Sequence, residues 1–266
     1  MPTEESIRTF LEAATAAAKS AGALQKERLW SDFAISYKGE VDLVTEVDRS
    51  CEDLIVTRLK EAFPDHGFLA EENIYEHRNL PYKWIIDPLD GTTNFAHGYP
   101  WFCVSIALEY EGEVLLGAIY HCMMDELFTA SKGGGAFLNG NPIRVSKRSP
   151  LKRSLLATGF PYDRTRDNEN NFGNFINFQL AARAVRRAGA AALDLAYVAA
   201  GRLDGYWECK LKPWDVAAGA LLITEAGGEV TNHAGLPYSP YDHRILASNG
   251  VIHQEMLEVL KPAEEG

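Results

Sequence analysis

Residues 83–95, KWIIDPLDGTTNF, decide how this chain folds and where its chemistry lies. The first four residues predict a buried strand that leads straight into two carboxylates, Asp87 and Asp90. Like charges held this close raise each other's pKa, so a buried strand would not end in them without compensation. Because Pro88 has no N–H with which to continue a ladder, we expect the chain to turn there and to place both carboxylates on one side. Beyond Gly91, the backbone N–H groups of a helix start could hold an anion.

Asp-Pro and Asp-Gly are also common turn dipeptides, so this stretch alone does not establish a site. Three other segments add carboxylates at the ends of predicted elements: residues 70–73 (AEEN), 44–48 (VTEVD) and 213–215 (PWD). Taken singly, the last two have ordinary readings as helix caps. Together the four segments predict a cluster of carboxylates, which is tolerable only with cations between them. Carboxylate, carbonyl and water oxygens are the ligands that Mg²⁺ prefers.

Apolar periodicity and turn residues divide the rest of the chain into a meander followed by alternating helices and strands. The predicted elements are helix 6–29, strand 41–45, helix 47–63, strands 102–110, 113–121 and 126–130, a further strand within 133–142, strand 154–158, helix 168–184, helix 189–200, strand 203–207, helix 214–228, strand 244–248 and a helix after 250. We expect one unit over 1–266, built from an α+β lobe over about 1–150 and an α/β lobe over about 151–266.

Composition narrows the class of protein. The chain has 266 residues, 46% hydrophobic and 24% charged, which is typical of a globular protein and not of a disordered one. With 26 Lys and Arg against 37 Asp and Glu, the chain has a net charge of -11, which makes nucleic acid an unfavourable partner. At first sight the same charge also disfavours substrates that carry phosphate. The four cysteines are far apart in sequence and predict reduced, buried thiols. With an acidic N-terminus and no apolar run long enough to span a bilayer, we expect a cytoplasmic protein with no membrane partner.

Taken together, these segments resemble the inositol monophosphatase family of Mg²⁺-dependent, lithium-sensitive phosphatases over nearly the whole chain. The first family signature is DPLDGTTNF at 87–95, and the second is WDVAAG at 214–219, running on to EAGG at 225–228. The acidic pair at 71–72 and the segment DLVTEVD at 42–48 also fall where the family has them. The resemblance implies an α/β (α+β) fold, the layered αβαβα sandwich of the inositol monophosphatase and fructose-1,6-bisphosphatase type.

The resemblance also implies a site to which both lobes contribute. The ligands of two to three Mg²⁺ ions would be Glu71, Asp87, the carbonyl of Leu89, Asp90 and Asp215. Thr92, paired with Asp48, would position and help deprotonate a water on the first ion, with Glu71 as a further catalytic residue. The substrate would lie against Asp90, Gly91, Thr92, Gly189, Ala191 and Glu208. Many members have Ser or Thr where this chain has Ala190, which leaves its polyol preference open.

The activity implied is hydrolysis of inositol monophosphate to inositol and phosphate by metal-activated water, with inhibition by Li⁺. Fructose-1,6-bisphosphatase, 3′(2′),5′-bisphosphate nucleotidase and histidinol phosphatase activities would use the same site. Haloacid-dehalogenase-type phosphatases have a single residue between their carboxylates, whereas Asp87 and Asp90 are separated by two. A role of another class, as an RNA polymerase accessory factor, stays open because LKPWD at 211–215 resembles the bacterial branch of the family. Homodimers are common in the family.

Overall fold

We describe a computed structural model of the chain, whose described residues are 2–37, 43–73, 75 and 80–260. Within them, the first half forms α1 (Glu4–Arg28), β1 (Ile35–Tyr37), β2 (Leu43–Thr45), α2 (Glu46–Ala62), β3 (Gly67–Ala70), β4 (Tyr82–Asp90), α3 (Thr92–Ala96), β5 (Cys103–Tyr110), β6 (Glu113–His121), β7 (Glu126–Ser131), β8 (Gly135–Leu138) and β9 (Asn141–Pro142). The second half forms a 3₁₀ turn (Leu151–Arg153), β10 (Leu155–Thr158), α4 (Phe172–Ala181), β11 (Ala184–Arg186), α5 (Ala191–Ala199), β12 (Gly205–Cys209), α6 (Pro213–Glu225), β13 (Glu229–Thr231), β14 (Arg244–Ser248) and α7 (His253–Leu260).

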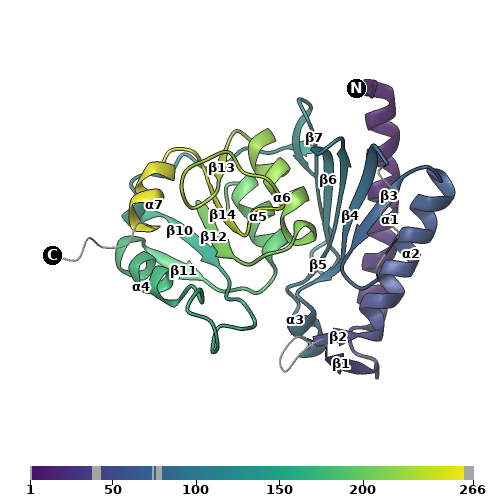
Figure 1. The fold of residues 1–266 in the computed structure, drawn as a ribbon, viewed down its shortest axis with the longest axis horizontal. Coiled ribbons are helices and arrows are strands. Elements are labelled where there is room, and N and C mark those ends of the chain that lie inside the picture. Colours follow the sequence, from purple (N-terminus) through teal and green to yellow (C-terminus); the bar gives the residue numbers. More distant parts are fainter. Residues whose placement is uncertain (1, 38–42, 74, 76–79, 261–266) are drawn as a thin grey trace.

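The described residues form five layers (Figure 1). Of the two large sheets, the first has the strand order β3-β4-β5-β6-β7-β8-β9 and the second has the order β11-β10-β12-β14-β13, while β1 and β2 form a separate two-stranded sheet. Helices α1 and α2 cover the outer face of the first sheet, α5 and α6 lie between the sheets, and α4 and α7 cover the outer face of the second. This is the αβαβα sandwich that the family resemblance implies. No helix of the described residues is both long and apolar enough to cross a membrane.

Small residues allow the middle helices to pack closely on both sides. A Cβ atom on Gly117 of β6 would lie 2.8 Å from the Cα of Ala218 in α6, and one on Gly219 would lie 2.6 Å from the Cβ of Leu195 in α5. A buried helix between two sheets has no solvent face, which explains why α5 and α6 are apolar nearly all round.

The predicted turn at Pro88 is wrong, because β4 continues through it to Asp90. On the neighbouring strand, Asp87 is opposite Ser105 and Asp90 is opposite Cys103, so two residues of β4 face one residue of β5. This is a β-bulge, a place where a residue without an N–H is tolerated because the ladder is already interrupted.

The remaining elements agree with the predictions in kind, except for the helix predicted over 168–184 and the short strands β1, β9, β11 and β13, which were not predicted. The meander β5-β6-β7-β8 is confirmed, and all four cysteines are free and buried. The helix predicted over 168–184 is shorter, because residues 184–186 instead form β11, which pairs with the edge of β10. Strand β13 was not predicted, since three residues carry no readable periodicity. Of the strand predicted over 41–45, residues 43–45 form β2, and residues 41–42 lie outside the described residues.

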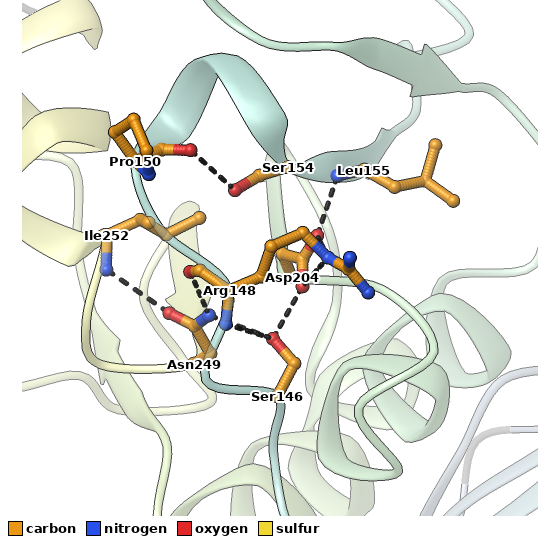
Figure 2. A network of polar contacts seen from close by, with 8 residues as sticks. All are labelled: Ser146, Arg148, Pro150, Ser154, Leu155, Asp204, Asn249 and Ile252. Carbon is orange, nitrogen blue, oxygen red and sulfur yellow. Dashed lines mark hydrogen bonds and ion pairs between the residues drawn. The ribbon is translucent and has the colours of Figure 1, made fainter.

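A buried carboxylate fixes the connection between the two sheets, which runs from β9 to β10 (Figure 2). Asp204, only 1% exposed, accepts hydrogen bonds from the Ser146 hydroxyl, from Arg148 Nε at 3.0 and 3.2 Å, and from the Leu155 N–H at 2.7 Å. Asn249 donates to Ser146 Oγ at 2.9 Å and to the Arg148 carbonyl at 3.0 Å. The lobe boundary predicted near residue 150 falls on this connection and stays a prediction.

We expect Asp204→Ala to lower the free energy of unfolding by about 3 kcal/mol, because it leaves several buried donors without their acceptor. Asp163→Ala is the matched control, since Asp163 is half exposed and forms a surface ion pair with Lys210, at 2.8 Å, whose loss costs about 1 kcal/mol or less. Urea unfolding followed by tryptophan fluorescence measures both values. Equal losses in the two variants would contradict this account of the network.

Candidate active site

The bulge at the end of β4 presents two buried carboxylates. Asp87 is 2% exposed and accepts the N–H of Leu89 at 3.0 Å, so its carboxylate is held by the peptide that follows Pro88. Asp90 is 8% exposed and lies where pairing with β5 resumes, opposite Cys103. The Cys103 thiol lies 3.7 Å from Asp90 Oδ2 and donates to it.

Asp90 also caps the first turn of α5. The N–H of Ala191 donates to Asp90 Oδ1 at 3.2 Å, and the N–H of Ala192 donates to Oδ2 at 2.7 Å. Ala190 is the N-cap residue and has no side-chain oxygen with which to make these bonds. The carboxylate therefore satisfies the free N–H groups of the helix and benefits from its dipole. This contact brings the predicted substrate segment Gly189–Ala191 to the first signature.

Gly91 and Asn94 hold the first signature against the loop before α5. Gly91 has a φ of 95°, and a Cβ there would lie 2.9 Å from the Trp101 carbonyl and 3.3 Å from the Gly189 carbonyl, so both the backbone and the space require glycine. The Asn94 side-chain amide donates to the carbonyls of Trp101 at 2.7 Å and Ala188 at 2.9 Å. The start of α3 thus lies beside the predicted substrate segment.

Thr92 and Asp48 form the predicted pair. The Thr92 hydroxyl lies 2.9 Å from Asp48 Oδ1 and 3.1 Å from the Leu89 carbonyl, and it can donate to either. Asp48 is fully buried and closes the capping box of α2, where its other oxygen accepts the N–H of Thr45 at 2.8 Å. Burial raises the pKa of Asp48, although its hydrogen bonds to Thr45 and Thr92 oppose that shift.

The other predicted metal ligands lie in the same electrostatic neighbourhood. Burial raises the pKa of Asp87 well above its usual value, and the charges of Glu71, Asp90 and Asp215 add to the shift. Burial likewise raises the pKa of Asp90 to about 7, with Glu71 adding to it. For Asp215, burial again dominates the rise in pKa, followed by the charge of Glu71. Carboxylates that are far apart in the sequence therefore act on one another electrostatically, and their role as metal ligands stays a prediction.

As they stand, no three His, Cys, Asp or Glu side chains among the described residues are arranged to hold a metal ion. The carboxylates instead accept hydrogen bonds from backbone N–H groups: Asp87 from Leu89, Asp90 from the first turn of α5, and Asp215 from Lys212 at 2.7 Å. Their chemistry nevertheless fits Mg²⁺, since the donors are hard oxygens and a cation would stabilise the charged forms that burial and, to a smaller extent, repulsion disfavour. A carboxylate oxygen that accepts a single backbone N–H, such as Asp90 Oδ1, keeps a second lone pair for a cation.

Glu208 lies in the second sheet and faces this acidic group. It is 8% exposed, accepts the hydroxyl of Tyr206, and has a pKa raised to about 7, chiefly by burial. A Cβ on Gly159 would lie 2.3 Å from its carboxylate oxygens, so the glycine makes room for that carboxylate. The charge of Asp90 raises the pKa of Glu208 as well, which places Glu208 near the metal-ligand candidates.

Three further polar residues at the site were not predicted. Glu52 is fully buried on α2 and accepts the N–H groups of Glu72 at 2.8 Å and Asn73 at 2.9 Å, so it orders the segment that follows Glu71. Asp194 is buried on α5, and burial raises its pKa well above the usual value. The charge of Arg187 lowers the pKa of both Asp194 and Glu208.

A signal for Glu52 was present in the sequence. It lies one helical turn before Val56 on the buried side of α2, where an unpaired glutamate would be costly. Arg187 gave no such signal, because an arginine beside another arginine in a loop is ordinarily a surface residue.

Known proteins share both this sequence and this fold. The profile of the inositol monophosphatase family matches residues 6–265. An inositol-1-monophosphatase from Synechocystis sp. is 47% identical over 257 residues, which cover 96% of this chain and 89% of that protein. The protein named Nus factor SuhB from Pseudomonas aeruginosa is 44% identical, with 96% and 97% of the two chains covered. The solved structure of an inositol monophosphatase from Anabaena (Nostoc) sp. superposes with a TM-score of 0.88 at 44% identity, with 96% of each chain covered.

The family profile spans nearly the whole chain, and the relatives share its length as well as its sequence. The structural match extends over both sheets and the helices between them. The chain belongs to the inositol monophosphatase family.

Proposed function

We propose that this protein is a Mg²⁺-dependent phosphomonoesterase that hydrolyses inositol monophosphate to inositol and phosphate. The observation that carries the proposal is the convergence of Asp87, Asp90 and Asp215 beside the hydrogen-bonded pair of Thr92 and Asp48. The 47% identity with a protein named inositol-1-monophosphatase supports the choice of substrate.

Two to three Mg²⁺ ions would be held by oxygen donors from both halves of the chain: Glu71, Asp87, the Leu89 carbonyl, Asp90 and Asp215. When bound, Mg²⁺ supplies positive charge to the phosphoryl group and lowers the pKa of the attacking water. The protein's own contribution is to fix these donors at the ends of different elements, so that they meet without being adjacent in the sequence.

Thr92 and Asp48 are proposed to move the proton. The Thr92 hydroxyl can pass its hydrogen to Asp48 Oδ1 while it accepts one from the attacking water. The raised pKa of Asp48 makes its carboxylate a better acceptor than an exposed aspartate. Because the water attacks phosphorus directly, no covalent phosphoenzyme is formed.

Substrate selection is assigned to the segment before α5 and to β12. Backbone N–H groups of Gly91 and Thr92 are proposed to contact the phosphate, while Asp90, Gly189, Ala191 and Glu208 contact the polyol. The buried Glu208 carboxylate can accept hydrogen bonds from ring hydroxyls, and Tyr206 holds it in place. Ala190 offers no hydroxyl where many members of the family have Ser or Thr, so the polyol preference is decided by the substrate panel below.

Self-association as a homodimer is part of the proposal. Phe172, Ile176 and Leu180 are spaced four residues apart on α4, and all are exposed, Leu180 by 83%. Such a stripe on a helix favours contact with another apolar surface.

The test of the function is a phosphatase panel of inositol 1-phosphate, fructose-1,6-bisphosphate, adenosine 3′,5′-bisphosphate and histidinol phosphate, each with and without Mg²⁺. We expect inositol 1-phosphate to give the highest kcat/KM, the activity to vanish with a chelator, and Li⁺ to inhibit. A higher kcat/KM on another member of the panel would support the proposed chemistry but contradict inositol monophosphate as the preferred substrate. Full activity in the chelator would contradict the metal requirement.

Thr92→Ala should lower kcat by at least about 100-fold, because it removes the hydroxyl between Asp48 and the attacking water. Thr92→Ser is the matched control, since it keeps the hydroxyl and should retain most of the activity. Steady-state kinetics at saturating Mg²⁺ measures both variants. Comparable activity in the alanine and serine variants would rule out the relay.

A second candidate function, binding to RNA polymerase as an accessory factor, is favoured by the 44% identity with the protein named Nus factor SuhB.

Asp90→Asn should lower kcat by at least about 100-fold, because it removes a charge needed for Mg²⁺, and yet leave polymerase binding unchanged. Asp125→Asn, at an exposed turn, is the control for both activities. Co-sedimentation with purified RNA polymerase measures binding, and no binding by the wild type would exclude the second function.

A further inference from the structure

We infer that Gln25 is a positioning residue for the candidate active site, which it reaches through the peptide between Pro88 and Leu89. The inference rests on the proposed function, because it concerns the orientation of Asp87, one of the proposed metal ligands. No residue of α1 contributes to the proposed chemistry directly.

Gln25 is a polar residue in an apolar place. It is fully buried on α1, on the same face as Ala14, Ala18 and Ala21, which pack against the first sheet. Burying an amide without partners costs free energy, so its contacts identify what it does there.

Both polar atoms of the Gln25 side chain are used. Nε2 donates to the Pro88 carbonyl at 2.8 Å, and Oε1 accepts the thiol of Cys122 at 3.6 Å. The Pro88 carbonyl can only accept a hydrogen bond, so the NH₂ group of the amide is turned toward Pro88, and the amide oxygen is left to accept from the thiol.

The Pro88 carbonyl needs this partner because it lies in the bulge of β4. Between Asp87 and Asp90 the pairing with β5 is interrupted, so the regular ladder does not hold the intervening peptide. Within that planar trans peptide, the Pro88 C=O and the Leu89 N–H point in opposite directions. When the carbonyl faces Gln25, the N–H faces away from α1 and donates to Asp87 Oδ1 at 3.0 Å.

One rigid peptide therefore connects Gln25 to Asp87. Loss of the amide donor leaves the peptide free to rotate, and Asp87 then loses the N–H that holds one of its oxygens. The same rotation moves the backbone nitrogen of Leu89, and with it the Leu89 carbonyl, which accepts a hydrogen bond from Thr92. The effect on the site is larger than one hydrogen bond would suggest, because two proposed ligands depend on it.

Gln25→Met tests this role, since methionine keeps the length and burial of the side chain and removes the donor. In the metal-free protein, we expect hydrogen exchange of the Leu89 amide, followed by NMR, to accelerate by at least about tenfold. Calorimetric titration with MgCl₂ should give a Kd raised by about tenfold, with a comparable fall in kcat on inositol 1-phosphate.

Phe10→Leu is the matched control, since Phe10 is buried on the same helix but packs on Phe63 and Trp84. It should lower the melting temperature and leave both Leu89 exchange and Mg²⁺ affinity unchanged. If Gln25→Met does not fold, Gln25→Leu decides, because it also removes the amide donor while it keeps an apolar side chain in the core, and it should likewise accelerate Leu89 exchange. Unchanged exchange in the folded variant overturns the role.

The titration separates this inference from the proposed function. A wild-type chain that binds no Mg²⁺ overturns the proposed function and with it the role of Gln25. A wild-type chain that binds Mg²⁺ with an affinity that Gln25→Met leaves unchanged overturns the role alone.

Discussion

The charges of Asp87, Asp90, Asp215 and Glu71 act on one another, and loss of solvent together with this repulsion raises the pKa of each of the three aspartates, of which Asp87 and Asp90 are buried and Asp215 is partly exposed. Desolvation and mutual repulsion both disfavour the charged carboxylates, so placing them together lowers the stability of the fold unless other groups stabilise their charge. Backbone N–H groups at the ends of elements do so: the bulge of β4, the start of α5 and the start of α6 each supply donors. The architecture is thus organised around element ends that meet at the acidic group.

The five-layer arrangement makes that meeting possible. Helices α5 and α6 lie between the two sheets, so their N-termini can approach the end of β4 in the first sheet. Close packing at Gly117 and Gly219 fixes how near the helices lie to the sheet and to each other. A larger residue at either position would move a helix whose first turn holds a proposed metal ligand. The packing of the core therefore also determines the geometry of the site.

Local signals allowed the sequence to predict much of this. The turns of the meander contain Gly112 and Asp125, both at positive φ, and the pair of Thr45 and Asp48 closes the capping box that its spacing predicts. Strands β1, β11 and β13 were not predicted, since a strand of three residues without a neighbouring motif depends on the strand that it pairs with. The bulge at Pro88 is likewise a property of two strands together.

The site residues that lie in the family signatures could be predicted from the sequence. The buried residues that hydrogen-bond to the backbone around them could not. Gln25 contacts a carbonyl 63 residues away, and Glu52 contacts N–H groups 20 and 21 residues away. Their position on apolar helix faces indicates that each must have a partner, but periodicity does not identify it. A polar residue on a core-facing stripe is thus a sign of a distant contact, and in this chain both contacts lead to the acidic group.

The net charge of -11 bears on function through these same carboxylates. Averaged over the surface, it disfavours polyanions such as nucleic acid. Within the site, however, the excess acidic residues are the groups whose charge bound Mg²⁺ would offset, so the local field can favour a phosphate ester. Asp90 connects the two, because its oxygens hold the first turn of α5 while Oδ1 keeps a lone pair for a cation. Since Ala190 provides no side-chain cap, the substrate segment takes its position from a proposed metal ligand, which couples cation binding to substrate recognition.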